Sequence, residues 1–202
     1  MDRSGLQRII PIVIVLVIAG VAIWALISLG RALFGGGDTS SSPIPVVNNG
    51  VQALTQTTAD RSVRMTVRGP IVANENFHSY TVTVAPDSRT MTTYKGYLSE
   101  QVNVSQLDNN VQAYTQLVTA LSRANLMEGT PLSGDADNTD GICATGYLYE
   151  FEVLQSTNTV QKLWTTNCKG SPGSLKANLT QVVNLFRAQI PDFVKLTTEV
   201  KL

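Results

Sequence analysis

The chain has 202 residues, which is enough for one ordinary domain plus additional segments. Its 15 basic and 15 acidic residues give a formal net charge of zero, so no strong overall field attracts nucleic acid, and we expect no nucleic-acid partner. A single histidine, His78, and two cysteines leave few of the groups that enzymes use for acid–base or nucleophilic catalysis.

An uninterrupted apolar segment, IIPIVIVLVIAGVAIWALISLG, covers residues 9–30 and carries no charged side chain. At ~1.5 Å per residue a helix of this length spans about 33 Å, slightly more than the ~30 Å hydrocarbon core of a bilayer. Pro11 lies in its first turn, where a missing N–H is tolerated. The sequence therefore predicts a transmembrane helix over 9–30, with the lipid bilayer as its partner.

A cleaved signal peptide is the alternative for this segment. Its apolar part is typically ~7–15 residues long and is followed by small residues, whereas this run is longer and Leu33 and Phe34 follow it. We interpret it as an uncleaved, single-pass signal anchor. Arg3 and Arg8 precede the helix and Arg31 follows it, which favours a cytoplasmic N-terminus.

The segment after the helix is rich in glycine, serine and proline, with GGGDTSSSPIPVVNNG at residues 35–50. Such a composition does not bury enough apolar surface to offset the entropy lost on ordering. We therefore expect a cytoplasmic N-terminus over 1–8, a tether over 31–50 and an extracytoplasmic domain over 51–202.

Residues 61–68, RSVRMTVR, alternate apolar and polar side chains, which predicts a half-buried strand. Its basic strip consists of Arg61, Arg64 and Arg68. We interpret this strip as the charged protection of a solvated edge strand, with contact to lipid head groups or an anionic wall polymer as the alternative.

A hairpin is predicted over residues 78–97. Tyr80, Val82 and Val84 share one face of its first strand, Pro86 and Asp87 supply the turn, and the return strand covers 89–95.

From Ser105 the apolar residues recur at steps of four and three, which predicts one stripe of a helix: Leu107, Val111, Tyr114, Val118 and Leu121. Ser105 and Asp108 resemble a capping box at its start. Gly129 and Pro131 are typical of its end.

A second hairpin is predicted from ATGYLYEFEVLQ, residues 144–155, and TVQKLWTTNC, residues 159–168. Ser174 is the expected N-cap of a last helix that ends at Pro191 and has this apolar stripe: Leu175, Leu179, Val182 and Phe186. The tail over 193–202 alternates and predicts a closing edge strand.

Taken in order, these elements predict an α+β fold. An N-terminal single transmembrane helix precedes an antiparallel sheet of two or more hairpins, with two helices packed on one face and the order βββαββα.

Cys143 precedes the second hairpin and Cys168 follows it. The open ends of two antiparallel strands lie side by side, so a disulfide between these residues is geometrically natural. Two unrelated buried thiols are the alternative. A disulfide requires an oxidising compartment, which agrees with the predicted orientation.

The segment PLSGDADNTDGIC, residues 131–143, clusters three aspartates: Asp135, Asp137 and Asp140. Their spacing superficially resembles a calcium loop, but Gly146 stands at the twelfth position, where an EF-hand requires glutamate. We interpret the segment as a polar loop that forms local turns, with a looser calcium site as the weak alternative and paired catalytic carboxylates as the last. We otherwise expect no metal site.

The sequence does not specify an activity, and we expect no enzyme, no catalytic residues and no cofactor. We predict a membrane-anchored extracytoplasmic module of a cell envelope, in the cell membrane, with a binding or structural role and an unidentified protein partner. A hydrolytic enzyme is a further alternative. Pilin-type filament subunits resemble this layout of a long N-terminal helix followed by a sheet and a disulfide, which implies a helix packed in a fibre core. Those subunits also carry a glutamate early in the helix, and residues 9–30 contain none.

Overall fold

The structure, a computed structural model, describes residues 49–171 and 173–200. The predicted cytoplasmic segment 1–8, the transmembrane helix 9–30 and residues 31–48 of the predicted tether lie outside the described residues. Among the helices that residues 49–171 and 173–200 form, none is long and apolar enough to cross a membrane.

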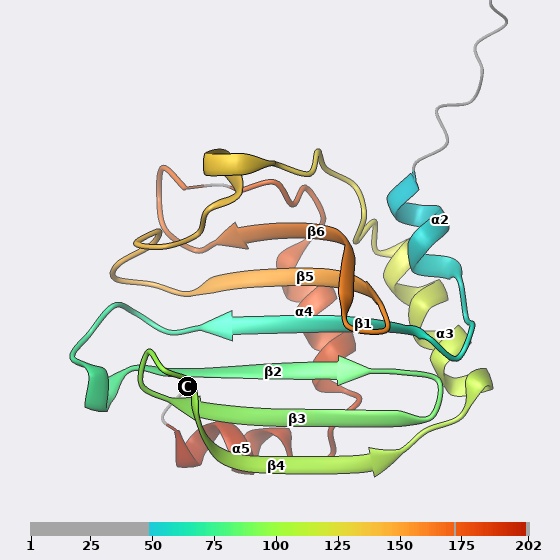
Figure 1. Ribbon diagram of the computed structural model, residues 1–202, viewed down its shortest axis with the longest axis horizontal. Helices are drawn as coiled ribbons and strands as arrows, with labels where there is room; N and C mark the ends of the chain where they lie inside the picture. The colour runs from blue at the N-terminus through green and yellow to red at the C-terminus, as the bar shows by residue number, and fades with distance from the viewer. Residues whose placement is uncertain (1–48, 172, 201–202) are drawn as a thin grey trace, which may run out of the picture. The chain divides into compact units, whose positions relative to one another are not determined.

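Six antiparallel strands form one sheet, in the order β4-β3-β2-β1-β5-β6 (Figure 1). The strands are β1 (Arg61–Arg68), β2 (His78–Val84), β3 (Ser88–Lys95), β4 (Glu100–Asp108), β5 (Leu148–Gln155) and β6 (Asn158–Thr166). The two predicted hairpins are confirmed as β2–β3 and β5–β6. Strand β1 lies in the middle of the sheet between β2 and β5, so its interpretation as an edge strand is wrong.

In the part of the chain that the structure describes, four α-helices accompany the sheet: α2 (Asn49–Thr55), α3 (Val111–Arg123), α4 (Leu179–Arg187) and α5 (Phe193–Glu199). Two short 3₁₀ helices, η1 (Asn74–Asn76) and η2 (Gly134–Asp137), lie in loops. In Figure 1, α4 and α5 lie behind the sheet, and α2 and α3 lie beside one end of the strands. The predicted α+β class and antiparallel sheet are confirmed, but the order βββαββα lacks α2, β4 and α5.

The predicted helix start at Ser105 is wrong, because residues 100–108 form β4 and pair with β3. Helix α3 begins at Val111, and its N-cap is Asn110, whose Oδ1 accepts a hydrogen bond from the Ala113 N–H at 2.9 Å. Asparagine satisfies a helix N-terminus as well as serine does. Tyr114, Val118 and Leu121 of the predicted stripe are buried as expected, whereas Val111 is 54% exposed.

Two further expectations at the C-terminus are wrong. Asn178 rather than Ser174 caps α4, and its Oδ1 accepts from Gln181 N–H at 3.0 Å. The predicted closing strand is instead helix α5, whose buried Phe193 and Thr197 are four residues apart on one helical face. The Phe193 ring packs edge-on against Tyr80 of β2, with centroids 5.3 Å apart, so α5 covers part of the sheet that would otherwise expose its apolar face.

Helices α4 and α5 cover one face of the sheet, α2 and α3 lie beside one end of the strands, and residues of all four helices contribute to one hydrophobic core (Figure 1). The strand residues in this core are Val63, Met65, Val67, Tyr80, Val82, Val84, Met91, Phe151, Val153 and Leu163. Their alternation leaves polar side chains on the opposite side, which we call the open face. On β1 these are Arg64, Thr66 and Arg68. None of the helices formed by the described residues covers this open face (Figure 1).

Candidate functional site

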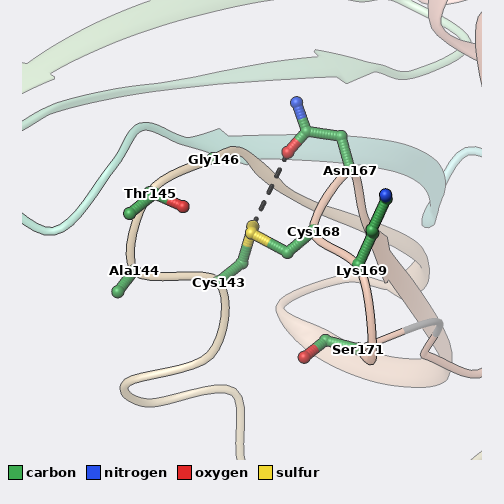
Figure 2. A pocket seen from close by; sticks show the side chains of 8 residues that line it. All are labelled: Cys143, Ala144, Thr145, Gly146, Asn167, Cys168, Lys169 and Ser171. Atoms are coloured by element: carbon green, nitrogen blue, oxygen red, sulfur yellow. Dashed lines mark hydrogen bonds between the residues drawn. A yellow bond between two sulfur atoms is a disulfide. The ribbon is translucent and has the colours of Figure 1, made fainter.

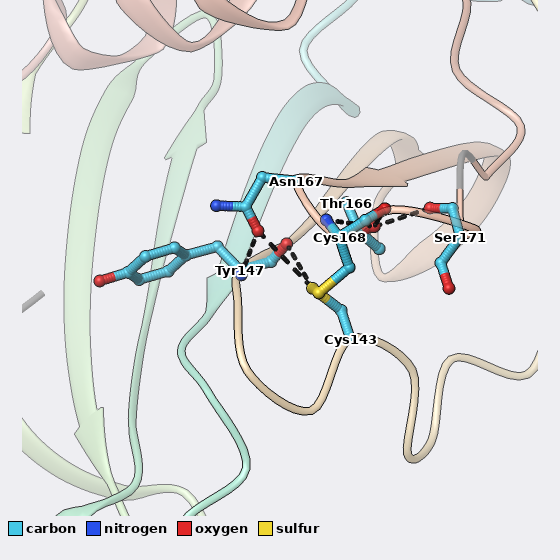
Figure 3. The surroundings of a disulfide bond; sticks show 6 residues. All are labelled: Cys143, Tyr147, Thr166, Asn167, Cys168 and Ser171. Atoms are coloured by element: carbon cyan, nitrogen blue, oxygen red, sulfur yellow. Dashed lines mark hydrogen bonds between the residues drawn. A yellow bond between two sulfur atoms is a disulfide. The ribbon is translucent and has the colours of Figure 1, made fainter.

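The predicted disulfide is confirmed: Cys143 and Cys168 are bonded, with Cα atoms 5.4 Å apart (Figure 3). It closes the open end of the β5–β6 hairpin. Beside it, Asn167 Oδ1 accepts from the Tyr147 N–H at 2.7 Å, and Asn167 N–H donates to the Tyr147 carbonyl at 3.2 Å. The bond therefore extends the strand ladder by a covalent link rather than joining distant segments.

A hollow of about 570 Å³ adjoins this bond, and Figure 2 shows its small and polar lining. Cys143 Sγ lies 3.6 Å from Tyr147 O and from Asn167 Oδ1, and since an oxidised sulfur carries no proton, these are close contacts. Gly146 allows this packing because a Cβ atom there would lie 2.8 Å from Cys143 Sγ. With both sulfurs bonded to each other, neither is a nucleophile, so the hollow offers structure rather than chemistry.

The three aspartates of the acidic loop do not converge. Asp137 Oδ2 forms an ion pair with Lys162 Nζ of β6 at 2.7 Å, whereas the side chains of Asp135 and Asp140 are exposed. Across residues 49–171 and 173–200, no group of three or more acidic, histidine or cysteine side chains is placed to hold a metal ion. The loop instead attaches to the open face of the sheet.

The attachment centres on Arg68 of β1. Its Nη2 donates to Glu150 Oε2 at 2.6 Å and to Thr139 Oγ1 at 2.9 Å, and the Thr139 hydroxyl in turn donates to Glu150 Oε1 at 3.2 Å. Thr139 belongs to the acidic loop, so this network fixes the loop above β1 and β5. The loop is therefore positioned by its threonine and by Asp137.

The basic strip of β1 is largely neutralised by acidic side chains of β5. Besides Arg68 with Glu150, Arg64 Nε pairs with Glu152 Oε2 at 2.7 Å. Burial disfavours the charged form of Glu152, but hydrogen bonds from Arg64 and Thr159 outweigh it and hold the pKa of this carboxyl below its usual value. The described structure thus does not present Arg64 and Arg68 as free cations for lipid or an anionic polymer.

Between the acidic loop and the β3–β4 loop lie two adjoining hollows, of about 550 and 320 Å³. Both are lined by Arg68, Phe77, Tyr97 and Asp140, and we call them together the sheet-face groove. Such volumes fall in the ~300–1,000 Å³ range of small-molecule sites. The floor of the larger hollow is formed by hydroxyl side chains of the central strands: Thr66, Ser79, Thr81 and Tyr94.

Tyr97 is the most prominent wall residue of the sheet-face groove. Its ring stacks on Phe77, with centroids 4.1 Å apart and an interplanar angle of 15°, and the side chain remains 48% exposed. Its hydroxyl donates to the Val72 carbonyl at 2.8 Å and accepts from the Val72 N–H at 3.1 Å. The Tyr97 N–H is held by Asn74 Oδ1 at 2.9 Å. The ring is therefore fixed in place before any ligand binds.

Several hydroxyls on the floor keep their hydrogen-bonding capacity. Among the described residues, the hydroxyls of Thr66 and Ser79 have no side-chain hydrogen-bond partner, and Thr81 Oγ1 and the Tyr94 hydroxyl are 3.5 Å apart. A hydroxyl both donates and accepts, so this floor suits a ligand with several polar groups.

Sequence reasoning did not identify the sheet-face groove. Its walls come from three separate regions, and only the alternating hydroxyls of HSYTVTV, residues 78–84, gave a local signal. His78 lines a separate hollow together with Glu75, Lys95 and Glu199.

No protein-family model matches the chain, and no curated protein matches it.

Proposed function

We propose that the chain is a membrane-anchored binding module whose domain lies outside the cytoplasm and uses the open face of its sheet to hold a partner or ligand of a cell envelope. One observation carries the proposal: the face of the sheet opposite α4 and α5 (Figure 1) has a groove with a fixed aromatic wall and a hydroxyl floor. Side chains that are already held in place lose little entropy when a ligand binds, and this favours a binding role for the groove.

The anchor and the orientation rest on two other features. The apolar run over 9–30 is long enough to span a bilayer, and the disulfide between Cys143 and Cys168 favours an oxidising compartment.

A binding role agrees better than catalysis with the chemistry of the groove. Arg68 and Glu150 neutralise each other, and Asp140 is the remaining ionisable carboxylate or cation among the described lining residues. A hydrolase requires a nucleophile or activated water beside a general base and an acid, and one exposed carboxylate does not supply that set.

Topology is tested with two cysteine substitutions, Leu98→Cys and Ser4→Cys, each made separately in the full chain. Leu98 is 96% exposed, and the native cysteines are bonded and do not react with maleimide. In intact expressing cells, a membrane-impermeant maleimide is expected to label position 98 and to label position 4 only after lysis. Labelling of position 4 alone refutes the orientation.

Extraction of the membranes with alkaline carbonate tests the anchor in parallel. An integral protein stays in the pellet, whereas a secreted product appears in the supernatant. Mechanical shearing of whole cells distinguishes a pilin-like filament subunit, which is released with the filaments. Recovery in either soluble fraction contradicts the membrane-anchored proposal.

A further inference from the structure

We propose that the sheet-face groove binds a neutral glycan, with a sugar ring seated on Tyr97 and its hydroxyl groups bonded to the hydroxyls of the groove floor. The glycan proposal rests on the proposed function, because it names the class of ligand that the same open face binds.

The wall supplies a flat apolar surface. The polar end of Tyr97 is already satisfied by the backbone of Val72, so the part of this side chain left for a ligand is the face of the ring. Phe77 stacks on one side of that ring and supports it. A pyranose ring presents a flat array of C–H groups, which packs on an aromatic face with little loss of side-chain entropy from a ring already held in place.

The floor supplies hydroxyls whose capacity is not used within the protein. Thr66 and Ser79 have no side-chain partner among the described residues, and Ser79 is nevertheless only 8% exposed. A sugar hydroxyl donates and accepts, as do threonine, serine and tyrosine hydroxyls, so each pair can orient to suit the other. Amphipathic ligands with one apolar face and a polar edge match this division between wall and floor.

The charge of the groove excludes acidic ligands. Arg68 is the only cation among the described lining residues, and it is paired with Glu150 at 2.6 Å. The carboxylate of Asp140 is left exposed at the rim, so the lining carries a net negative charge. An anionic polymer would be repelled, whereas a carboxylate accepts hydrogen bonds from neutral sugar hydroxyls.

The backbone of the floor argues against an extended peptide. Strands β1, β2 and β3 each have a paired neighbour on both sides, so their N–H and C=O groups are used in the sheet. A peptide that binds by strand addition requires free backbone groups at a sheet edge, which this groove does not offer. Recognition here depends on side chains, as expected for a glycan.

Calorimetric titration of the full chain in micelles tests the proposal. The detergent has a polyoxyethylene head group, because maltoside detergents carry sugars that would compete. The probes are cellotetraose and a tetramer of N-acetylglucosamine as neutral glycans, tetragalacturonate as an acidic glycan, and an uncharged octapeptide. At least one neutral probe is expected to bind with a Kd of about 1 mM or tighter, and at least about tenfold more tightly than the acidic probe.

Variants assign binding to the groove. Tyr97→Ala is expected to weaken binding by about tenfold or more, and Tyr97→Phe, which keeps the ring, by less than about threefold. Thr81→Val keeps the shape of the floor and removes a hydroxyl, so an intermediate loss of affinity is expected. This variant tests the groove if Tyr97→Ala fails to fold. The matched control is Leu98→Ala, which alters the neighbouring residue outside both hollows and leaves binding unchanged.

The proposal is overturned if both neutral probes fail to bind at 10 mM, about tenfold above the weakest expected Kd. Tighter binding of the octapeptide or the acidic tetramer also overturns it, as does wild-type affinity in both Tyr97→Ala and Thr81→Val. These titrations use the purified chain, so their outcomes do not depend on the topology experiment. Failure of the topology experiment would refute the membrane-anchored function and leave the glycan test intact.

Discussion

Replacing Cys143 and Cys168 by alanine removes the covalent closure of the β5–β6 hairpin and leaves its strand pairing in place. The bond joins residues 25 positions apart. In the chain-entropy relation a closed loop of this length restricts the unfolded chain by about 3.5 kcal/mol at 25 °C. Because the free energy of unfolding falls by about 2 kcal/mol per molar urea, we expect the unfolding midpoint of the double variant to fall by about 1.7 M.

Urea titration of the full chain in micelles measures this shift through the fluorescence of Trp164, which is only 4% exposed in the folded domain. Reduction of the wild-type protein is expected to reproduce the shift, and the same reductant should leave the double variant unchanged. A midpoint shift below about 0.5 M, less than a third of the expected value, would refute the inference that the bond restrains the unfolded chain.

Three further outcomes are expected from urea or thermal unfolding. Glu152→Gln should lose about 1–2 kcal/mol at pH 7. The pKa of Glu152 is depressed in the folded state, so this residue contributes its full stabilisation to the folded protein above its ordinary pKa of 4.5 and loses it as the pH falls through the lower folded pKa. A difference in stability between Glu152→Gln and wild type that persists at pH 2 contradicts the pairing with Arg64. Tyr114→Phe should gain about 1 kcal/mol, because the Tyr114 hydroxyl is buried without a hydrogen-bond partner among the described residues and burial raises its pKa to about 12; a loss of stability would reveal a partner. Gly129→Ala should lose more than about 2 kcal/mol, because its φ is +149° and a Cβ would lie 2.1 Å from a backbone carbonyl oxygen. The control Gly141→Ala, with φ +73° and open space around it, should lose about 1 kcal/mol; equal losses would show that conformation rather than contact decides.

Strong periodicity explains the parts of the fold that were predicted correctly. The alternation in RSVRMTVR and in LYEFEVLQ separates core from open face, and the structure pairs these two segments side by side as β1 and β5. What the sequence could not show was this pairing. Glu152 lies directly opposite Arg64, and Glu150 lies opposite Thr66 and reaches Arg68 diagonally. The arginines that suggested an exposed edge strand therefore form ion pairs inside the sheet.

The errors fall on segments whose local pattern was ambiguous. In β4, Val102 and Val104 alternate with polar residues as in a strand, but both are exposed. The spacing of Leu107 relative to the apolar residues of the following helix therefore suggested a helix that begins too early. Asn110, directly before the buried stripe, was the available signal for the true helix start. The C-terminal segment that begins at Phe193 has both the alternating pattern of a strand and the spacing of a helix. The packing of Phe193 on the sheet favours the helix. The groove depends on loops that meet only in the folded chain.

Strand β4 forms one edge of the sheet, and its Val102 and Val104 side chains are 44% and 55% exposed. Two chains meeting along this edge in symmetric antiparallel register around Val104 would place Glu100 of one chain opposite Asp108 of the other. Like charges placed opposite each other destabilise such a pair. In this register the charges at the ends of β4 oppose the addition of a second copy of the chain to the sheet.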